Sequence, residues 1–167
     1  MVQAQPDRPH YRNLLASSYI QKVRETTDFS YLDRANSIVD TVLGQDSSEY
    51  EALRLKLEIE LERHNFKQVA ELAGRMTKAA PNDPWNWGAL GDSQIELGNY
   101  DAAADAYQRM VVLRPDLASY NRAAWFRFLA NDQPGAVKIM KIAIDAGSSS
   151  AENVAWCMVE LLSLIHI

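Results

Sequence analysis

The fold of this chain is decided by residues 83–116, DPWNWGALGDSQIELGNYDAAADAYQRMVVLRPD, which predict two helices folded back on each other. Asp83 can cap the first helix with its side chain. Gly98 stands where a helix often has a left-handed residue after its last turn, and Asn99 can cap the next helix. Pro115 then ends the second helix, because proline cannot continue it.

Each of the two predicted helices has one packing face. At helical spacing, the first face carries Trp87, Leu90, Gly91 and Gln94, and the second carries Ala103, Tyr107 and Met110. Gly91 and Ala103 are the small members of these sets, so we expect them to let the two backbones approach closely. The aromatic residues Trp87 and Tyr107 would fill the space around that contact.

This spacing resembles the tetratricopeptide repeat, whose signature places Trp, Leu-Gly, Tyr, Ala, an aromatic residue and Pro at fixed offsets within about 34 residues. Every position is matched except one, because Gln94 stands where the family usually has Tyr. The resemblance extends over nearly the whole chain, which looks like a bacterial tetratricopeptide protein. It implies an all-α fold, a right-handed α-solenoid of antiparallel helix pairs that bury their apolar faces against their neighbours.

Weaker copies of the pattern flank the central repeat. We expect repeats at residues 10–46, 49–82, 83–116 and 117–150, with the start of a further repeat at 151–161. Gly44 and Gly147 are expected to end the first and fourth of them. The packing residues of the first pair lie about two helical turns farther apart than in the central repeat, which predicts longer helices or a longer turn at residues 26–30.

Residues 49–64 are ambiguous in type, because apolar residues at every second position from Leu53 to Leu61 alternate with charged ones, as in a half-buried strand. However, Ile59 is the one β-branched residue of this alternating run, and Leu, Glu, Lys and Arg favour helices. Several of the leucines are also four residues apart, as on one face of a helix. We therefore interpret this stretch as a helix, followed by a second helix at residues 66–79.

The two ends are expected to lie outside the array. Residues 1–9 are polar and contain proline, so we predict a flexible N-terminal lead. Residues 162–167, LSLIHI, look like the translation of a transposon end sequence used to prepare sequencing libraries. We therefore expect a non-native tail there and a natural protein, truncated in this chain, that continues beyond Leu161. The helix that begins at residue 151 would then lack its partner.

Composition argues against several classes of function. The net charge is −5 and basic residues are scattered singly, which disfavours nucleic-acid binding. The single cysteine, Cys157, excludes an internal disulfide framework, and the three histidines are isolated from other metal ligands. The sequence has no phosphate-binding loop, no nucleophile turn and no apolar run long enough to span a bilayer. We expect no catalytic residue, no metal and no cofactor, and a cytoplasmic location by default; a secreted or periplasmic location stays open if the true N-terminus is missing.

The predicted binding surface is the concave face lined by the first helix of each pair. Its candidate residues are Arg54, Glu58, Glu62, Trp85, Asp92, Glu96, Asn121, Trp125 and Phe128. Trp125 could anchor a partner or could cover a neighbouring helix, and both interpretations stay open. The acidic candidates would repel a terminal carboxylate, so they favour a basic or amide-rich ligand with an apolar side chain.

These observations predict a scaffold that binds another protein or a peptide and has no catalysis of its own. One alternative is an accessory or regulatory fragment of a larger enzyme, or of a secretion or transport assembly, whose other domains are missing from this chain. Another is a structural array that self-associates through its exposed last helix.

Overall fold

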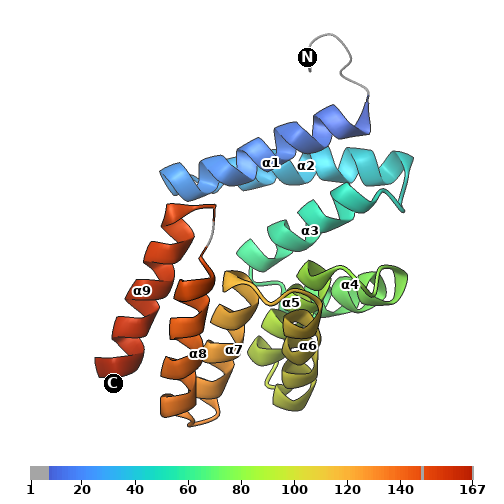
Figure 1. Cartoon of the computed structure of the whole chain (residues 1–167). Coiled ribbons are helices and arrows are strands. Elements are labelled where there is room, and N and C mark those ends of the chain that lie inside the picture. Colours follow the sequence, from blue (N-terminus) through green and yellow to red (C-terminus); the bar gives the residue numbers. More distant parts are fainter. Residues whose placement is uncertain (1–7, 148, 167) are drawn as a thin grey trace. The chain divides into compact units, whose positions relative to one another are not determined.

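In a computed structural model, residues 8–147 and 149–166 are described, and they form nine α-helices and no strand (Figure 1). The helices are α1 (Pro9–Thr26), α2 (Ser30–Gln45), α3 (Tyr50–Glu62), α4 (Phe66–Ala79), α5 (Pro84–Glu96), α6 (Tyr100–Leu113), α7 (Leu117–Leu129), α8 (Gln133–Ala146) and α9 (Ala151–His166). The all-α prediction is confirmed, and the ambiguous stretch at residues 49–64 is the helix α3. Most of the predicted lead and the last residue of the predicted tail lie outside the described residues.

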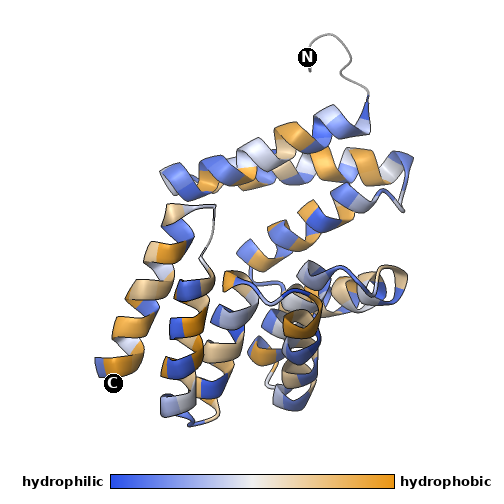
Figure 2. Cartoon of the chain, viewed as in Figure 1, coloured by the Kyte–Doolittle hydropathy of each residue, from blue (hydrophilic) through white to orange (hydrophobic). Residues whose placement is uncertain are grey.

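The chain divides into two compact units, Met1–Val69 and Ala70–Ile167, and the boundary falls inside α4. Polar and apolar residues alternate along the helices of both units, as expected of helices that bury one face (Figure 2). The repeat boundaries within residues 10–161 stay a prediction.

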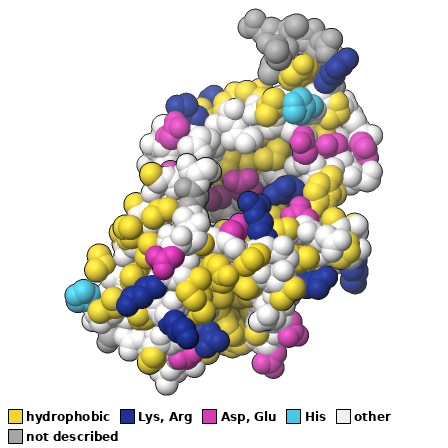
Figure 3. All heavy atoms as spheres, viewed as in Figure 1, with side chains coloured by type: hydrophobic (Ala, Val, Ile, Leu, Met, Phe, Trp, Pro, Cys, Tyr) yellow, Lys and Arg dark blue, Asp and Glu magenta, His cyan; other side chains and the backbone are white. Residues whose placement is uncertain are grey.

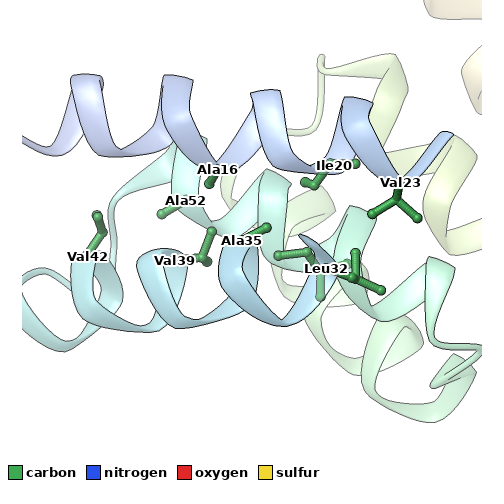
Figure 4. Close-up of a cluster of buried hydrophobic side chains, with 9 residues drawn as sticks. Ala16, Ile20, Val23, Leu32, Ala35, Val39, Val42 and Ala52 are labelled. Carbon is green, nitrogen blue, oxygen red and sulfur yellow. The ribbon is translucent and has the colours of Figure 1, made fainter. Parts of the chain in front are cut away.

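The first unit is built on a long antiparallel pair, α1 and α2, with α3 packed beside it (Figure 4). Its core contains Ala16, Ile20 and Val23 of α1, Leu32, Ala35, Val39 and Val42 of α2, and Ala52 and Ile59 of α3. The paired helices have 18 and 16 residues, so longer helices explain the wider spacing of their packing residues. Gly44 does not end α2 as predicted: the helix runs on to Gln45, and its C-cap residue, Asp46, is extended, so no left-handed glycine is needed there.

The second unit contains the central helix pair, and most of its predicted boundaries are confirmed. The Asp83 side chain accepts a hydrogen bond from the backbone N–H of Trp85 at 2.9 Å, Gly98 has a φ of 77°, and α6 ends at Leu113, before the proline. Asn99 is the N-cap residue of α6 as predicted, but its side chain does not cap the helix. Its side-chain amide makes no cap bond and instead donates to Oε1 of Gln94 at 2.8 Å, which ties the turn to the preceding helix.

The second unit has its own core, formed where α7, α8 and α9 pack together. It contains Leu117, Ala124, Ala136, Met140, Ala143, Cys157 and Leu164. Gly147 ends α8 with a φ of 66°, as predicted. The predicted tail continues α9 as far as His166, and within it Leu164 is fully buried and its carbonyl accepts a hydrogen bond from Gln133 at 2.6 Å.

Candidate functional site

Three helices of the second unit meet at one carboxylate. Arg122 of α7 donates to Asp92 of α5 in a bidentate ion pair, with Nε 2.9 Å from Oδ1 and Nη2 2.9 Å from Oδ2. The hydroxyl of Tyr107, on α6, donates to the same Oδ1 at 2.8 Å. Both charged side chains are less than a third exposed, at 31% for Arg122 and 27% for Asp92. Bidentate pairing fixes the geometry as well as the charge, so this cluster holds α5, α6 and α7 in register.

Two glycines of α5 make room for this cluster. A Cβ atom at position 91 would lie 2.5 Å from Cδ1 of Tyr107, and one at position 88 would lie 3.0 Å from Sδ of Met110 and 3.4 Å from Nε of Arg122. The small residues were expected to bring two backbones together around Gly91 and Ala103. Ala103 is fully buried, but the space at Gly91 is filled by the aromatic ring of Tyr107.

The electrostatics of the cluster follow from its burial. Burial raises the pKa of Tyr107, and the charge and hydrogen bond of Asp92 raise it further. For Arg122, burial is the largest single influence and lowers the pKa, but the charge and hydrogen bond of Asp92, with further contributions from Tyr107 and Asp116, together raise the pKa above its usual value. The negative charge expected to line the binding surface at Asp92 is therefore neutralised by an arginine of the same chain.

The most exposed aromatic of the predicted site is Trp125, three residues after Arg122 and so on the same side of α7. Its side chain is 39% exposed, and its ring centroid lies 5.4 Å from that of Phe128. Leu129 extends the apolar surface and is 43% exposed. Behind this surface, the ring of Phe126 meets that of Tyr107 edge-on at 6.1 Å. We call Trp125, Phe128 and Leu129 the α7 patch.

The remaining candidates in the second unit have different surroundings. The Asn121 amide donates to Sγ of Cys157 at 3.3 Å and to Sδ of Met140 at 3.7 Å, so it is engaged in packing between α7, α8 and α9. Trp85, in the first turn of α5, is partly exposed, and Glu96, at the end of that helix, is exposed. Neither belongs to the ion-pair cluster described above.

Three candidates belong to the first unit and follow one face of α3 at four-residue spacing: Arg54, Glu58 and Glu62. Arg54 and Glu58 are partly buried, whereas Glu62 is exposed. Burial raises the pKa of Glu58, the nearby Glu62 raises it further, and Arg24 and Arg54 oppose that shift. The net charge of these three side chains is therefore negative. In the second unit, by contrast, Arg122 neutralises the charge of Asp92.

Two further kinds of feature are absent from the described residues. No group of three or more His, Cys, Asp and Glu side chains among them is arranged to hold a metal ion. Within the same residues, every helix is too short or too polar to cross a membrane.

Known proteins resemble this chain in structure. No protein-family model and no curated sequence matches it. Among solved structures, TTC0263, a thermophilic TPR protein of Thermus thermophilus, has a TM-score of 0.74 at 12% identity, over 90% of this chain and 83% of that one. A tetratricopeptide repeat protein from Parabacteroides merdae ATCC 43184 has a TM-score of 0.76 at 16% identity, over 98% of this chain and 59% of its own.

A third similar structure is MamA from Desulfovibrio magneticus RS-1, with a TM-score of 0.68 at 17% identity, over 88% of this chain and 82% of that one. At such low identity, these likenesses show the fold alone. The chain therefore has the tetratricopeptide repeat fold, and the resemblance seen in its sequence is confirmed at that level.

Proposed function

We propose that this chain is a non-catalytic scaffold whose second unit binds a segment of another protein through the α7 patch. The observation that carries the proposal is the half-exposed indole of Trp125 beside Phe128 and Leu129. Aromatic residues supply a large share of the energy of protein interfaces, because they offer a large and rigid contact surface.

Rigid support beneath the patch favours this role. Trp125 lies on the helix that the Arg122–Asp92 pair fixes to α5, and the adjacent Phe126 packs on Tyr107. A surface held in place loses little conformational freedom when it binds, so less of the contact energy is spent on ordering it. The best ligand would place an apolar side chain against the indole and leave amide groups at the polar border.

Selection from a displayed library of random peptides tests the proposal. The selected peptide is then titrated against the whole chain and against Trp125→Ala, which we expect to weaken binding by about tenfold or more. Tyr100→Ala is the matched control, because Tyr100 is an exposed aromatic residue on α6 of the same unit and lies outside the patch. Helical signal and melting temperature should stay close to those of the original chain.

Two results would contradict the proposal. Equal binding by Trp125→Ala and the original chain would place the peptide site elsewhere. A large loss of stability in Trp125→Ala would show that the indole belongs to the core. The indole N–H signals of the tryptophans in a heteronuclear NMR spectrum give an independent check, since the Trp125 signal should shift on addition of the selected peptide.

A further inference from the structure

Arg122, which lies beside the α7 patch, has two N–H groups that bond nothing in the described part of the chain. A guanidinium carries five N–H groups. Its Nε–H is shared between Oδ1 and Oδ2 of Asp92, at 2.9 Å and 3.1 Å. One N–H of Nη2 donates to Oδ2 at 2.9 Å, and one N–H of Nη1 donates to the Ala118 carbonyl at 3.3 Å. One N–H therefore remains on each terminal nitrogen, and we call these two groups the spare donors.

The Arg122 side chain is partly accessible and is held in place. It is 31% exposed, so a ligand can reach the guanidinium. The bidentate pair with Asp92 fixes the plane of the guanidinium, and Gly88 of α5 lies beneath it, since an added Cβ there would be 3.4 Å from Nε. A group that is already oriented loses little conformational freedom on binding. The spare donors are therefore suited to a hydrogen bond with a ligand.

The spare donors and the α7 patch are close enough for one peptide to contact both. Trp125 follows Arg122 by three residues, which places the two on one side of α7 with Cβ atoms roughly 5–6 Å apart. An extended peptide advances about 3.3 Å per residue. A peptide whose apolar side chain covers the indole would thus bring a main-chain carbonyl to Arg122 within about two residues. Hydrophobic side chains gather on the surface of the second unit with Lys and Arg side chains among them, so apolar and donor groups adjoin there (Figure 3).

The charge of Asp92 favours a neutral acceptor over a carboxylate. A ligand carboxylate would be attracted by Arg122 but repelled by Asp92, whose oxygens lie 2.9 Å from the guanidinium nitrogens. Because Coulomb energies fall only as the inverse of distance, the attraction and the repulsion largely cancel. A carbonyl oxygen has no net charge and can accept the spare donors without that repulsion.

We infer that Arg122 determines which ligands the α7 patch accepts. Its spare donors bind a main-chain carbonyl oxygen of an extended peptide, and an apolar side chain of the same peptide, within about two residues of that carbonyl, covers Trp125. This inference rests on the proposed function, because it names the ligand group that is recognised beside the same patch. A helical ligand does not fit, because its main-chain carbonyls already accept hydrogen bonds within the helix.

Replacement of single carbonyls in the peptide tests the inference on the unmodified chain. In the peptide selected for binding to the α7 patch, one main-chain carbonyl at a time is converted to a thiocarbonyl, whose sulfur is a weaker acceptor. One such replacement, within about two residues of the side chain that covers Trp125, should weaken binding by about tenfold in isothermal titration calorimetry. Thiocarbonyls farther along the peptide should have little effect.

A conservative variant assigns that effect to Arg122. Arg122→Lys keeps a positive charge beside Asp92 but loses the planar set of donors, so the sensitive thiocarbonyl should weaken its binding by less than about twofold. Arg127→Lys is the matched control. Arg127 is also on α7 and is also paired with an aspartate, Asp132 at 2.6 Å, but it follows Trp125 by two residues and so lies on the opposite side of the helix. This control should respond to the thiocarbonyl like the original chain.

NMR of the arginine side chains gives a second measurement that needs no substitution. The hydrogens on Nη1 and Nη2 of Arg122 should exchange with water more slowly when the selected peptide is bound, because the spare donors are then engaged. The Arg127 hydrogens should not change.

The outcomes separate this inference from the proposed function. A peptide with no sensitive carbonyl, an equal thiocarbonyl effect on the original chain and Arg122→Lys, or unchanged Arg122 signals while the Trp125 indole signal shifts would each overturn the inference and leave the proposed function standing. Equal binding of the peptide to Trp125→Ala and the original chain would instead remove the proposed function, and this inference with it.

Discussion

The aromatic ring of Tyr107 occupies the place where a side chain at Gly91 would have to be. This contact lets the Tyr107 hydroxyl reach the Asp92 carboxylate, which lies one residue after the glycine on α5. A single position without a side chain therefore supports both the α5–α6 packing and the ion pair with α7.

Gly91→Ala should lower the free energy of unfolding by about 1–3 kcal/mol, because the added methyl group overlaps the Tyr107 ring and the buried ring has little room to move. Urea unfolding followed by circular dichroism measures the change. Gly74→Ala is the matched control: this glycine lies within α4 and has no atom near the position of an added Cβ. That substitution should leave stability unchanged or raise it by up to about 1 kcal/mol. Equal effects of the two variants would refute the packing argument.

Tyr107→Phe should change how stability depends on pH. Burial and the neighbouring Asp92 raise the pKa of Tyr107 in the folded chain, whereas in the unfolded chain it ionises near pH 10. The contribution of Tyr107 is thus fully present below about pH 10 and is lost as the pH rises further. The free energy of unfolding should fall less steeply above about pH 10 in Tyr107→Phe than in the original chain.

Urea unfolding at a series of pH values measures that slope. Tyr100→Phe is the matched control, since Tyr100 is an exposed tyrosine at the start of the same helix. The control should keep the original slope. If both variants give the same slope as the original chain, Tyr107 does not carry this pH dependence.

Glu49→Ala should destabilise the first unit by about 2–3 kcal/mol, because two bonds end on one oxygen of this residue. Oε2 of Glu49 accepts the backbone N–H of Ala52 at 2.6 Å, which caps α3, and the amide of buried Asn13 at 2.9 Å. Thermal and urea unfolding would report the loss. Glu51→Ala, an exposed glutamate two residues further on, should stay within about 0.5 kcal/mol of the original chain. A similar loss in both variants would contradict the special role of Glu49.

Cys157 should resist thiol reagents in the folded chain. Burial raises the pKa of its thiol, although the hydrogen bond from Asn121 opposes this, and the side chain is fully buried between α9 and its neighbours. Reaction with a chromogenic disulfide should therefore be slow in buffer and should reach one thiol per chain in denaturant. Fast stoichiometric labelling without denaturant would show that α9 detaches readily from the rest of the unit.

The fold was predictable where the deciding signals are local. A helix starts directly after Asp83, which has a side chain suited to capping it. Gly98 follows that helix, and glycine is the residue type that adopts the left-handed backbone conformation with little strain. Asn99 is at the predicted N-cap position, but its side-chain NH2 donates to Gln94 and its oxygen caps no backbone N–H, an orientation that the sequence does not reveal. Gly44 was mispredicted because a glycine near the end of a helix can also be helical, and the sequence does not say which conformation it takes.

The candidate site was less predictable, because its side chains are engaged by neighbouring helices. Asp92 and Asn121 were assigned to the binding surface from their offset to a packing face, which does not reveal that Arg122 and Cys157 bond to them. One signal was present: Arg122 follows Asp92 by 30 residues, one helical turn less than a repeat of about 34. Opposite charges at that separation lie on the facing sides of the first helices of two successive repeats. The partial exposure of Trp125 depends on helix crossing angles and has no such signal.

The bidentate pair between Arg122 and Asp92 also determines what this surface can discriminate. The Arg122 guanidinium already binds both oxygens of the Asp92 carboxylate, so a cationic group of a ligand would have to displace it. Displacing that guanidinium would strand a partly buried arginine and release α7 from α5. If the proposed α7 patch binds a ligand, we therefore expect stacking and size, more than the sign of the ligand's charge, to decide which ligands bind beside this ion pair.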